Sequence, residues 1–139
     1  MPDHLELSNP TAASPPVGQY TNVAVVAPAA AVAYVAGQLP VDGQAQVVAP
    51  GDFDRQADAV FASLARTLEA AGSSMAGVAF VRAHLVDEAH WGPFRDARAR
   101  AFQRHGVSQP PPATTVVVRS LFGGSLIELD AVAVVGEER

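Results

Sequence analysis

Two carboxylates near the end of the chain have a spacing that could support acid–base chemistry. Glu128 and Asp130 alternate with three apolar residues, Ile127, Leu129 and Ala131. Alternation of this kind is typical of a half-buried β-strand, and it predicts that both acids point away from the core. A carboxylate in partly dry surroundings can act as a general base towards water. On a fully solvated face the same group is only a surface charge.

The face that carries these acids is not uniformly polar. It also carries the apolar residues Leu126, Val132 and Val134. For Glu128 the catalytic and the solvent-exposed interpretations therefore both stay open, whereas for Asp130 we favour a solvated surface carboxylate.

A second polar group is predicted on a neighbouring strand, where His84 shares one face with Phe80 and Arg82. Histidine titrates near neutral pH and could serve as an acid or a base, although a single strand histidine is more often structural. The remaining histidines do not have the spacing of metal ligands, so we predict no metal site.

Composition excludes several kinds of chemistry. The 139 residues include no cysteine, which excludes disulfides, thiolate metal sites and a cysteine nucleophile. All nine basic residues are arginine, so no lysine is present to form a Schiff base. The arginines are dispersed and the net charge is −5, which argues against nucleic-acid binding.

The chain divides into three parts by composition. Residues 1–18 are polar and rich in proline, so we expect a flexible N-terminal arm before a single domain over 19–136 and an acidic tail over 137–139. The arm does not have the pattern of a signal peptide. The apolar run over 23–37 is too short to cross a bilayer. We therefore expect a cytoplasmic protein without a membrane partner.

Periodicity and turn residues predict the elements that position these side chains. Apolar and β-branched runs predict strands over 23–28, 31–37, 78–86, 114–119 and 126–135. Asp52 is a suitable N-cap for a helix that ends at Gly72. The apolar residues of that helix, at helical spacing, are Phe53, Ala57, Val60, Leu64 and Leu68.

A second helix is predicted after Asp87 or Glu88, either of which could cap it, and Gly106 ends it. Its apolar stripe, which we expect to pack into the core, is Trp91, Phe94, Ala101 and Phe102.

The order of elements is therefore ββαβαββ. It predicts an α/β (α+β) fold with two helices on one face of a single mixed sheet. The other face needs a cover, for which a partner subunit is the obvious candidate. An apolar content of 49% supports an oligomer.

Short motifs in register resemble one known family. They are AGQLPVD at 36–42, Gln56-Ala57, Ala71-Gly72, Asp87 and the terminal pair TTVVV…IELDAVAV. Each motif is weak alone, but their order and spacing agree over about 19–134. The chain is thereby identified as a divergent member of the RidA/YjgF family, also called the L-PSP endoribonuclease-like family.

The resemblance implies a chorismate-mutase-like subunit and a homotrimer with three interfacial clefts. In the best-known branch these clefts hydrolyse reactive imines or enamines to a keto acid and ammonia without a metal or an organic cofactor. Glu128 aligns with a glutamate that handles the attacking water. The other aligned positions, expected to contact the substrate, are Tyr20, Ala36, Gly37, Gln38, His84, Ala113 and Thr114.

The same branch carries a Pro-Ala-Arg-Thr/Ser signature, whose arginine clamps a substrate carboxylate. In the corresponding stretch, residues 111–115, we place Ala113 at the arginine position. Loss of such a contact should cost roughly 2–5 kcal/mol of binding. Arg82 and Arg95 are possible replacements, although surface roles are favoured for both. Alanine also replaces a serine at position 36, so a more apolar cleft is expected.

Two functions follow from these expectations. The first is a hydrolase or deaminase-like enzyme of altered specificity that acts on a small imine, enamine or related carbonyl compound. The alternative is a non-catalytic small-molecule-binding or accessory trimer. Strict imino-acid deamination ranks below both, and the acidic charge argues against a ribonuclease.

Overall fold

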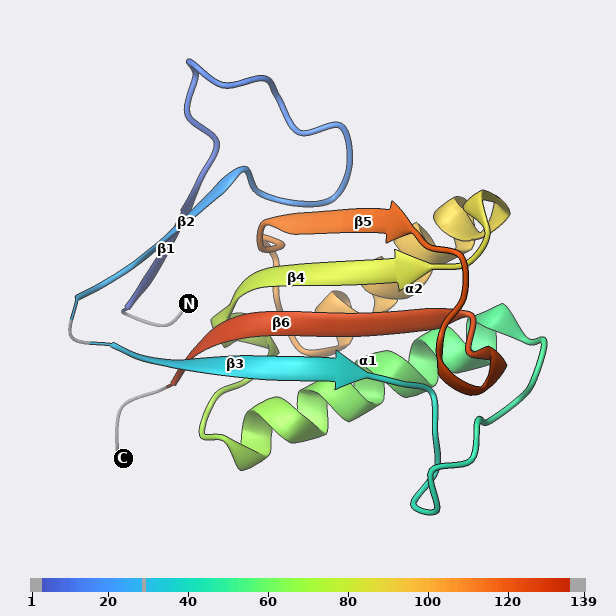
Figure 1. The fold of residues 1–139 in the computed structure, drawn as a ribbon. Helices are drawn as coiled ribbons and strands as arrows, with labels where there is room; N and C mark the ends of the chain where they lie inside the picture. The colour runs from blue at the N-terminus through green and yellow to red at the C-terminus, as the bar shows by residue number, and fades with distance from the viewer. Residues whose placement is uncertain (1–3, 29, 136–139) are drawn as a thin grey trace.

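A computed structural model describes residues 4–28 and 30–135 and contains two sheets and two long helices (Figure 1). The strands are β1 (Leu5–Ser8), β2 (Val23–Val26), β3 (Ala31–Gln38), β4 (Val78–Leu85), β5 (Ala113–Val117) and β6 (Ile127–Val135). The helices are α1 (Phe53–Ala70) and α2 (Trp91–Arg104). Three short 3₁₀ helices join them: η1 (Met75–Gly77), η2 (Glu88–His90) and η3 (Phe122–Gly124).

The main sheet has the strand order β3-β6-β4-β5. The pairs β3–β6 and β6–β4 are antiparallel, whereas β4–β5 is parallel. Along β6 the buried residues alternate with half-buried ones, because one face packs against the helices. The two helices packed on a mixed sheet confirm the predicted fold class.

Helix α1 forms where the sequence predicts it. The Asp52 carboxylate accepts a hydrogen bond of 3.1 Å from the Arg55 backbone N–H and so caps the first turn. The apolar stripe is buried, and Leu64 and Leu68 are fully enclosed. Gly72 follows the helix with a φ of +85°, a conformation that favours glycine.

Helix α2 differs in one respect from the prediction. Asp87 caps η2 by accepting a hydrogen bond from the Ala89 N–H at 2.9 Å, and α2 begins only at Trp91. Phe94 and Phe102 are buried as expected, but Trp91 is 45% exposed. The expectation that Trp91 packs into the core is therefore wrong. Its place in the first helical turn puts it beside a cavity instead.

The first predicted strand does not join the main sheet. β2 pairs with β1 in a separate antiparallel two-stranded sheet, with Leu5 opposite Val26. Leu5 is buried with Ala79 and Val134 in a small second cluster. Part of the predicted N-terminal arm is thus a strand packed against the domain. The predicted tail over 137–139 lies outside the described residues.

The face of the main sheet opposite the helices carries a mixture of polar and apolar side chains. Tyr34 on this face is 82% exposed, and Val32 and Val116 are also exposed. Figure 1 shows both helices on the other side of the sheet. We call this surface, with Tyr34, Arg82, His84, Glu128 and Asp130, the open face. No helix among residues 4–28 and 30–135 is long and apolar enough to cross a membrane.

Candidate functional site

Glu128 bends over the backbone of β3 on the open face. A Cβ atom built on Gly37 would lie 2.1 Å from the Glu128 Oε2 and 2.7 Å from its Cδ. The carboxylate therefore occupies the space that a side chain at position 37 would take. The Glu128 carboxylate has no hydrogen-bond or ion-pair partner among the described residues. An unpaired, half-buried carboxylate is available to bind water or a ligand.

A β-bulge lies at this contact. Val35 pairs with Ala131 and Gln38 pairs with Leu129, so Ala36 and Gly37 together stand opposite a single residue of β6. The extra residue at a bulge is left out of the regular ladder, and bulges are common beside active sites. The bulge turns Ala36 and Gly37 into exposed positions next to Glu128. The structure thus brings together three of the predicted site residues.

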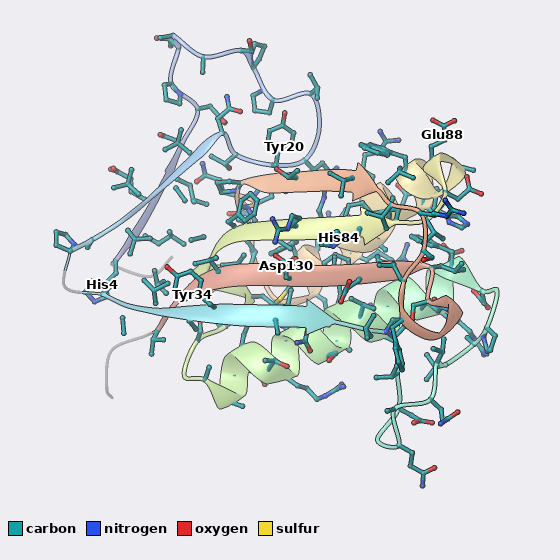
Figure 2. All side chains as sticks on the ribbon, in the orientation of Figure 1. His4, Tyr20, Tyr34, His84, Glu88 and Asp130 are labelled. Atoms are coloured by element: carbon teal, nitrogen blue, oxygen red, sulfur yellow. The ribbon has the colours of Figure 1, made fainter. Side chains whose placement is uncertain are left out.

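His84 belongs to a polar network beside Glu128. The Arg82 Nε donates to the Asp130 Oδ2 at 3.2 Å, and the His84 Nε2 lies 3.9 Å from the same oxygen. The His84 Nδ1 lies 3.4 Å from the Glu128 backbone carbonyl oxygen. Figure 2 shows His84 and Asp130 together near the centre of the open face. Arg82 is ion-paired, in agreement with the favoured surface role.

Gln38 is not a ligand-facing side chain. Its Oε1 accepts hydrogen bonds from the Ser63 hydroxyl at 2.7 Å and the Thr67 hydroxyl at 3.2 Å, both on α1. Its Nε2 donates to the Ala36 carbonyl at 2.9 Å. The amide thus attaches β3 to α1 and is not available to bind a ligand, so Gln38 does not belong to the candidate site.

The arginine position of the family signature falls on Thr114 rather than Ala113. Ala113 pairs with Val81, and its side chain packs against the helix-side core. Thr114 pairs with Arg82, so it lies on the open face and is exposed. Pro112-Ala113-Thr114 also aligns directly with the Pro-Ala-Arg part of the signature. Ala113, the position predicted for the arginine, faces the core instead.

Tyr20 lies beyond the β5 edge of the sheet (Figure 2). Its loop is attached to the segment before β5, because the Thr21 N–H donates to the Pro111 carbonyl at 3.3 Å and the Thr21 hydroxyl donates to the Pro110 carbonyl. The Tyr20 hydroxyl oxygen accepts a hydrogen bond from the Val17 N–H at 3.2 Å. Tyr20 lines two adjoining cavities with residues of α2.

Sequence analysis missed one residue in this region, Arg98. It is only 7% exposed and lies between the two cavities. A sequence signal was available, since Arg98 falls four residues after Phe94 and four before Phe102, on the apolar stripe of α2. Burial lowers the pKa of the Arg98 guanidinium, and the neighbouring positive charge of Arg95 lowers it further.

The site divides into two parts within one chain. Glu128, Gly37, Ala36 and His84 lie towards β3 and β6, whereas Tyr20 and Thr114 lie at the β5 edge. Two strand spacings and two residues along the strand separate Glu128 from Thr114, which is about 12 Å. In the part of the chain that the structure describes, no cluster of three or more His, Asp or Glu could hold a metal ion.

Two helices packed on one face of a mixed sheet, with a second two-stranded sheet beside it, define a small α+β domain. The family model described as Endoribonuclease L-PSP matches residues 11–135. The chain therefore belongs to the RidA/YjgF (L-PSP) family, as its motifs predict.

Individual relatives agree with this assignment. The chain is 30% identical over 118 residues to Protein DfrA of Myxococcus xanthus, which covers 85% of this chain and 86% of that one. It is 31% identical over 114 residues to a RutC family protein of Sulfurisphaera tokodaii, covering 82% and 86%. The solved structure of a Rid family protein of unknown function, YyfB of Yersinia pestis, superposes with a TM-score of 0.81 at 22% identity and covers 95% and 99%.

Proposed function

We propose that this chain forms a homotrimer and hydrolyses a small imine, enamine or related carbonyl compound in clefts between its subunits, with a specificity that differs from classical imino-acid deaminases. Glu128 is the catalytic base. One observation supports this role above all: its carboxylate is unpaired, half-buried and held over the backbone at Gly37. A base of this kind contributes about 10²–10⁴-fold to a rate.

The chemistry needs only water and proton transfers. Glu128 accepts a proton from water while the water oxygen bonds to the imine carbon. That proton then passes to the nitrogen and gives a carbinolamine. Glu128 next accepts the carbinolamine hydroxyl proton and passes it to the nitrogen, so that the carbonyl forms as the C–N bond breaks and ammonia leaves. His84, within 3.4 Å of the Glu128 carbonyl, adjoins this base and could assist at the nitrogen. No cofactor is required for these steps.

The trimer is supported by the open face and by the divided site. An exposed tyrosine together with exposed valines leaves an apolar surface that a second copy would cover. Within a single chain, Glu128 lies about 12 Å along the sheet from Thr114, which lines a cavity together with Tyr20. A cleft between copies would bring the Glu128 part of one subunit to the Tyr20 and Thr114 part of its neighbour. The net charge of −5 favours a small-molecule ligand in the cytoplasm over a nucleic acid.

A non-catalytic binding trimer is the second candidate. It is favoured by Thr114, because threonine offers no cation where the family signature has arginine. Such a protein would be stabilised by its ligand without turnover.

The test is an assay in which an L-amino-acid oxidase generates 2-imino acids, with a neutral imine of similar size assayed in parallel. We expect the wild type to accelerate hydrolysis of at least one of them, and Glu128→Gln to lower the rate roughly 100-fold. Glu69→Gln, which makes the same change at an exposed site on α1, is the control and should retain the rate. Thr114→Arg should raise the rate for imino acids in particular.

No acceleration of either substrate by the wild type would reject the enzyme and leave the binding trimer. Light scattering tests the assembly separately, with an expected mass of three times 14.4 kDa. Tyr34→Glu, which puts a charge on the exposed apolar surface at the β3 edge of the sheet, should shift that mass towards the single chain.

A further inference from the structure

Arg98 is a buried cation without a counter-charge among the described residues. Its Nε is buried and has no hydrogen-bond partner. None of the ion pairs among the described residues includes it, and its Cζ lies 5.1 Å from the centre of the Phe94 ring. A buried guanidinium without an anion is costly, so such groups normally have a carboxylate or phosphate partner.

A cavity of about 280 Å³ adjoins this guanidinium. It lies between the first half of α2, the β5 edge and the Val17–Tyr20 loop. Its lining includes both Arg95 and Arg98 but no Asp or Glu. A second cavity, of about 510 Å³, lies on the other side of Arg98 and is also lined without Asp or Glu. Cations in a concave site without counter-charges attract anions.

The remaining lining residues indicate the kind of anion. The Tyr20 hydroxyl accepts from the Val17 N–H and keeps its own proton to donate. Thr115, which shares the helix-side face of β5 with Ala113, also lines the cavity and contributes a second hydroxyl. Trp91, Phe94 and Val17 supply apolar walls. Two cations and two hydroxyl donors suit a carboxylate, and the walls suit an apolar or aromatic body.

We propose that this cavity binds a small carboxylate with an apolar or aromatic body, and that Arg98 and Arg95 of α2 hold the carboxylate. The guanidinium fork of Arg98 takes the carboxylate oxygens while Arg95 adds charge at the rim. The cation absent from β5 at Thr114 is thereby replaced from the neighbouring helix. This inference deepens the proposed function by naming its ligand class, and it rests on that proposal only where the ligand is called a substrate.

Trp91 gives a direct readout, because it is the only tryptophan in the chain and lines the cavity. Phenylacetate, titrated into the full chain, should change its fluorescence saturably, whereas neutral benzyl alcohol should not. Arg98→Met should weaken the affinity roughly tenfold or more, and Arg95→Met by a smaller factor. Arg104→Met changes an exposed arginine at the other end of α2 and should bind like the wild type.

Two further measurements make the test decisive. Arg98→Met should melt at or above the wild-type temperature, because methionine removes an unpaired buried charge and keeps the length of the side chain. Phenylacetate should still bind Glu128→Gln saturably, because that variant keeps Arg98 and Arg95, whether or not it turns over a substrate; this separates the inference from the proposed catalysis.

Equal responses to phenylacetate and benzyl alcohol would overturn the inference, as would wild-type affinity in Arg98→Met. Inorganic phosphate that competes as strongly as phenylacetate would show an unselective anion site and reject the carboxylate class. Should Arg98→Met fail to fold, Arg95→Met decides, since its side chain is exposed, and unchanged binding in that variant would refute the pair of arginines.

Discussion

Gly37→Ala should impair catalysis far more than stability. The new Cβ would lie 2.1 Å from the Glu128 Oε2, and ordinary contact begins near 3.4 Å. The carboxylate oxygen must therefore move by about 1.3 Å, the difference between these two distances. A displacement of about 1 Å in a catalytic group can cost roughly 100-fold in rate. We expect a loss of that order in the imine-hydrolysis assay.

The stability cost should be small because the atoms that clash belong to the flexible end of a side chain. Gly37 does not have a positive φ, so alanine can take its backbone conformation without strain. A side chain forced towards another rotamer costs about 1 kcal/mol. For a chain of this size that corresponds to a fall in Tm of roughly 4 °C, measurable by thermal denaturation.

A double-mutant cycle isolates the contact. In a Glu128→Ala background the clash is gone, so Gly37→Ala should no longer lower the Tm. Gly43→Ala is the matched control, because nothing lies within 4 Å of a Cβ at that position. Wild-type turnover in Gly37→Ala would refute the placement of Glu128. An equal loss of Tm in both backgrounds would refute it independently of any enzymatic activity.

Two further perturbations test the scaffold. Gln56→Leu should destabilise the fold by roughly 1–3 kcal/mol in urea denaturation, because the fully buried Gln56 side chain accepts a hydrogen bond of 2.9 Å from the half-buried Leu126 N–H, which leucine cannot accept; a stability equal to wild type would contradict this. The pKa of Asp42 lies below its usual value because its carboxylate accepts hydrogen bonds from the Gln46 and Gln44 N–H groups. The depressed pKa adds stability above the ordinary value of 3.8, and that contribution is lost as the pH falls through the folded-state pKa. Asp42→Asn should therefore lower the Tm at pH 7 but not at pH 2, and an equal effect at both would contradict the assignment.

Local periodicity predicted most of the secondary structure. Asp52, the apolar stripe of α1 and Gly72 all lie within one helix, so their spacing alone fixes its start, buried face and end. β1 escaped prediction because its four residues lie in a polar, proline-rich segment, and its partner β2 begins fifteen residues further on.

The site was predicted less completely, for a reason of register. Alternation placed Glu128 and Asp130 on one face correctly, because the period of a strand is two residues. The same rule applied to β5 separates Ala113 from Thr114, but only pairing with Val81 and Arg82 shows which of them faces the core. A shift of one residue exchanges the two faces of a strand, so the choice between Ala113 and Thr114 decides whether that position faces the core or the open face.

The sequence by itself determined the family, the two helices, the mixed sheet and the shared face of Glu128 and Asp130. Only the tertiary structure decided that Glu128 lies over Gly37, ninety-one positions earlier in the chain, that Gln38 turns to α1, and that Arg98 is buried without a counter-charge. Composition and spacing report what each segment prefers locally. Contacts between distant strands, and the burial of a charge between a helix and a loop, depend on how those segments pack against one another.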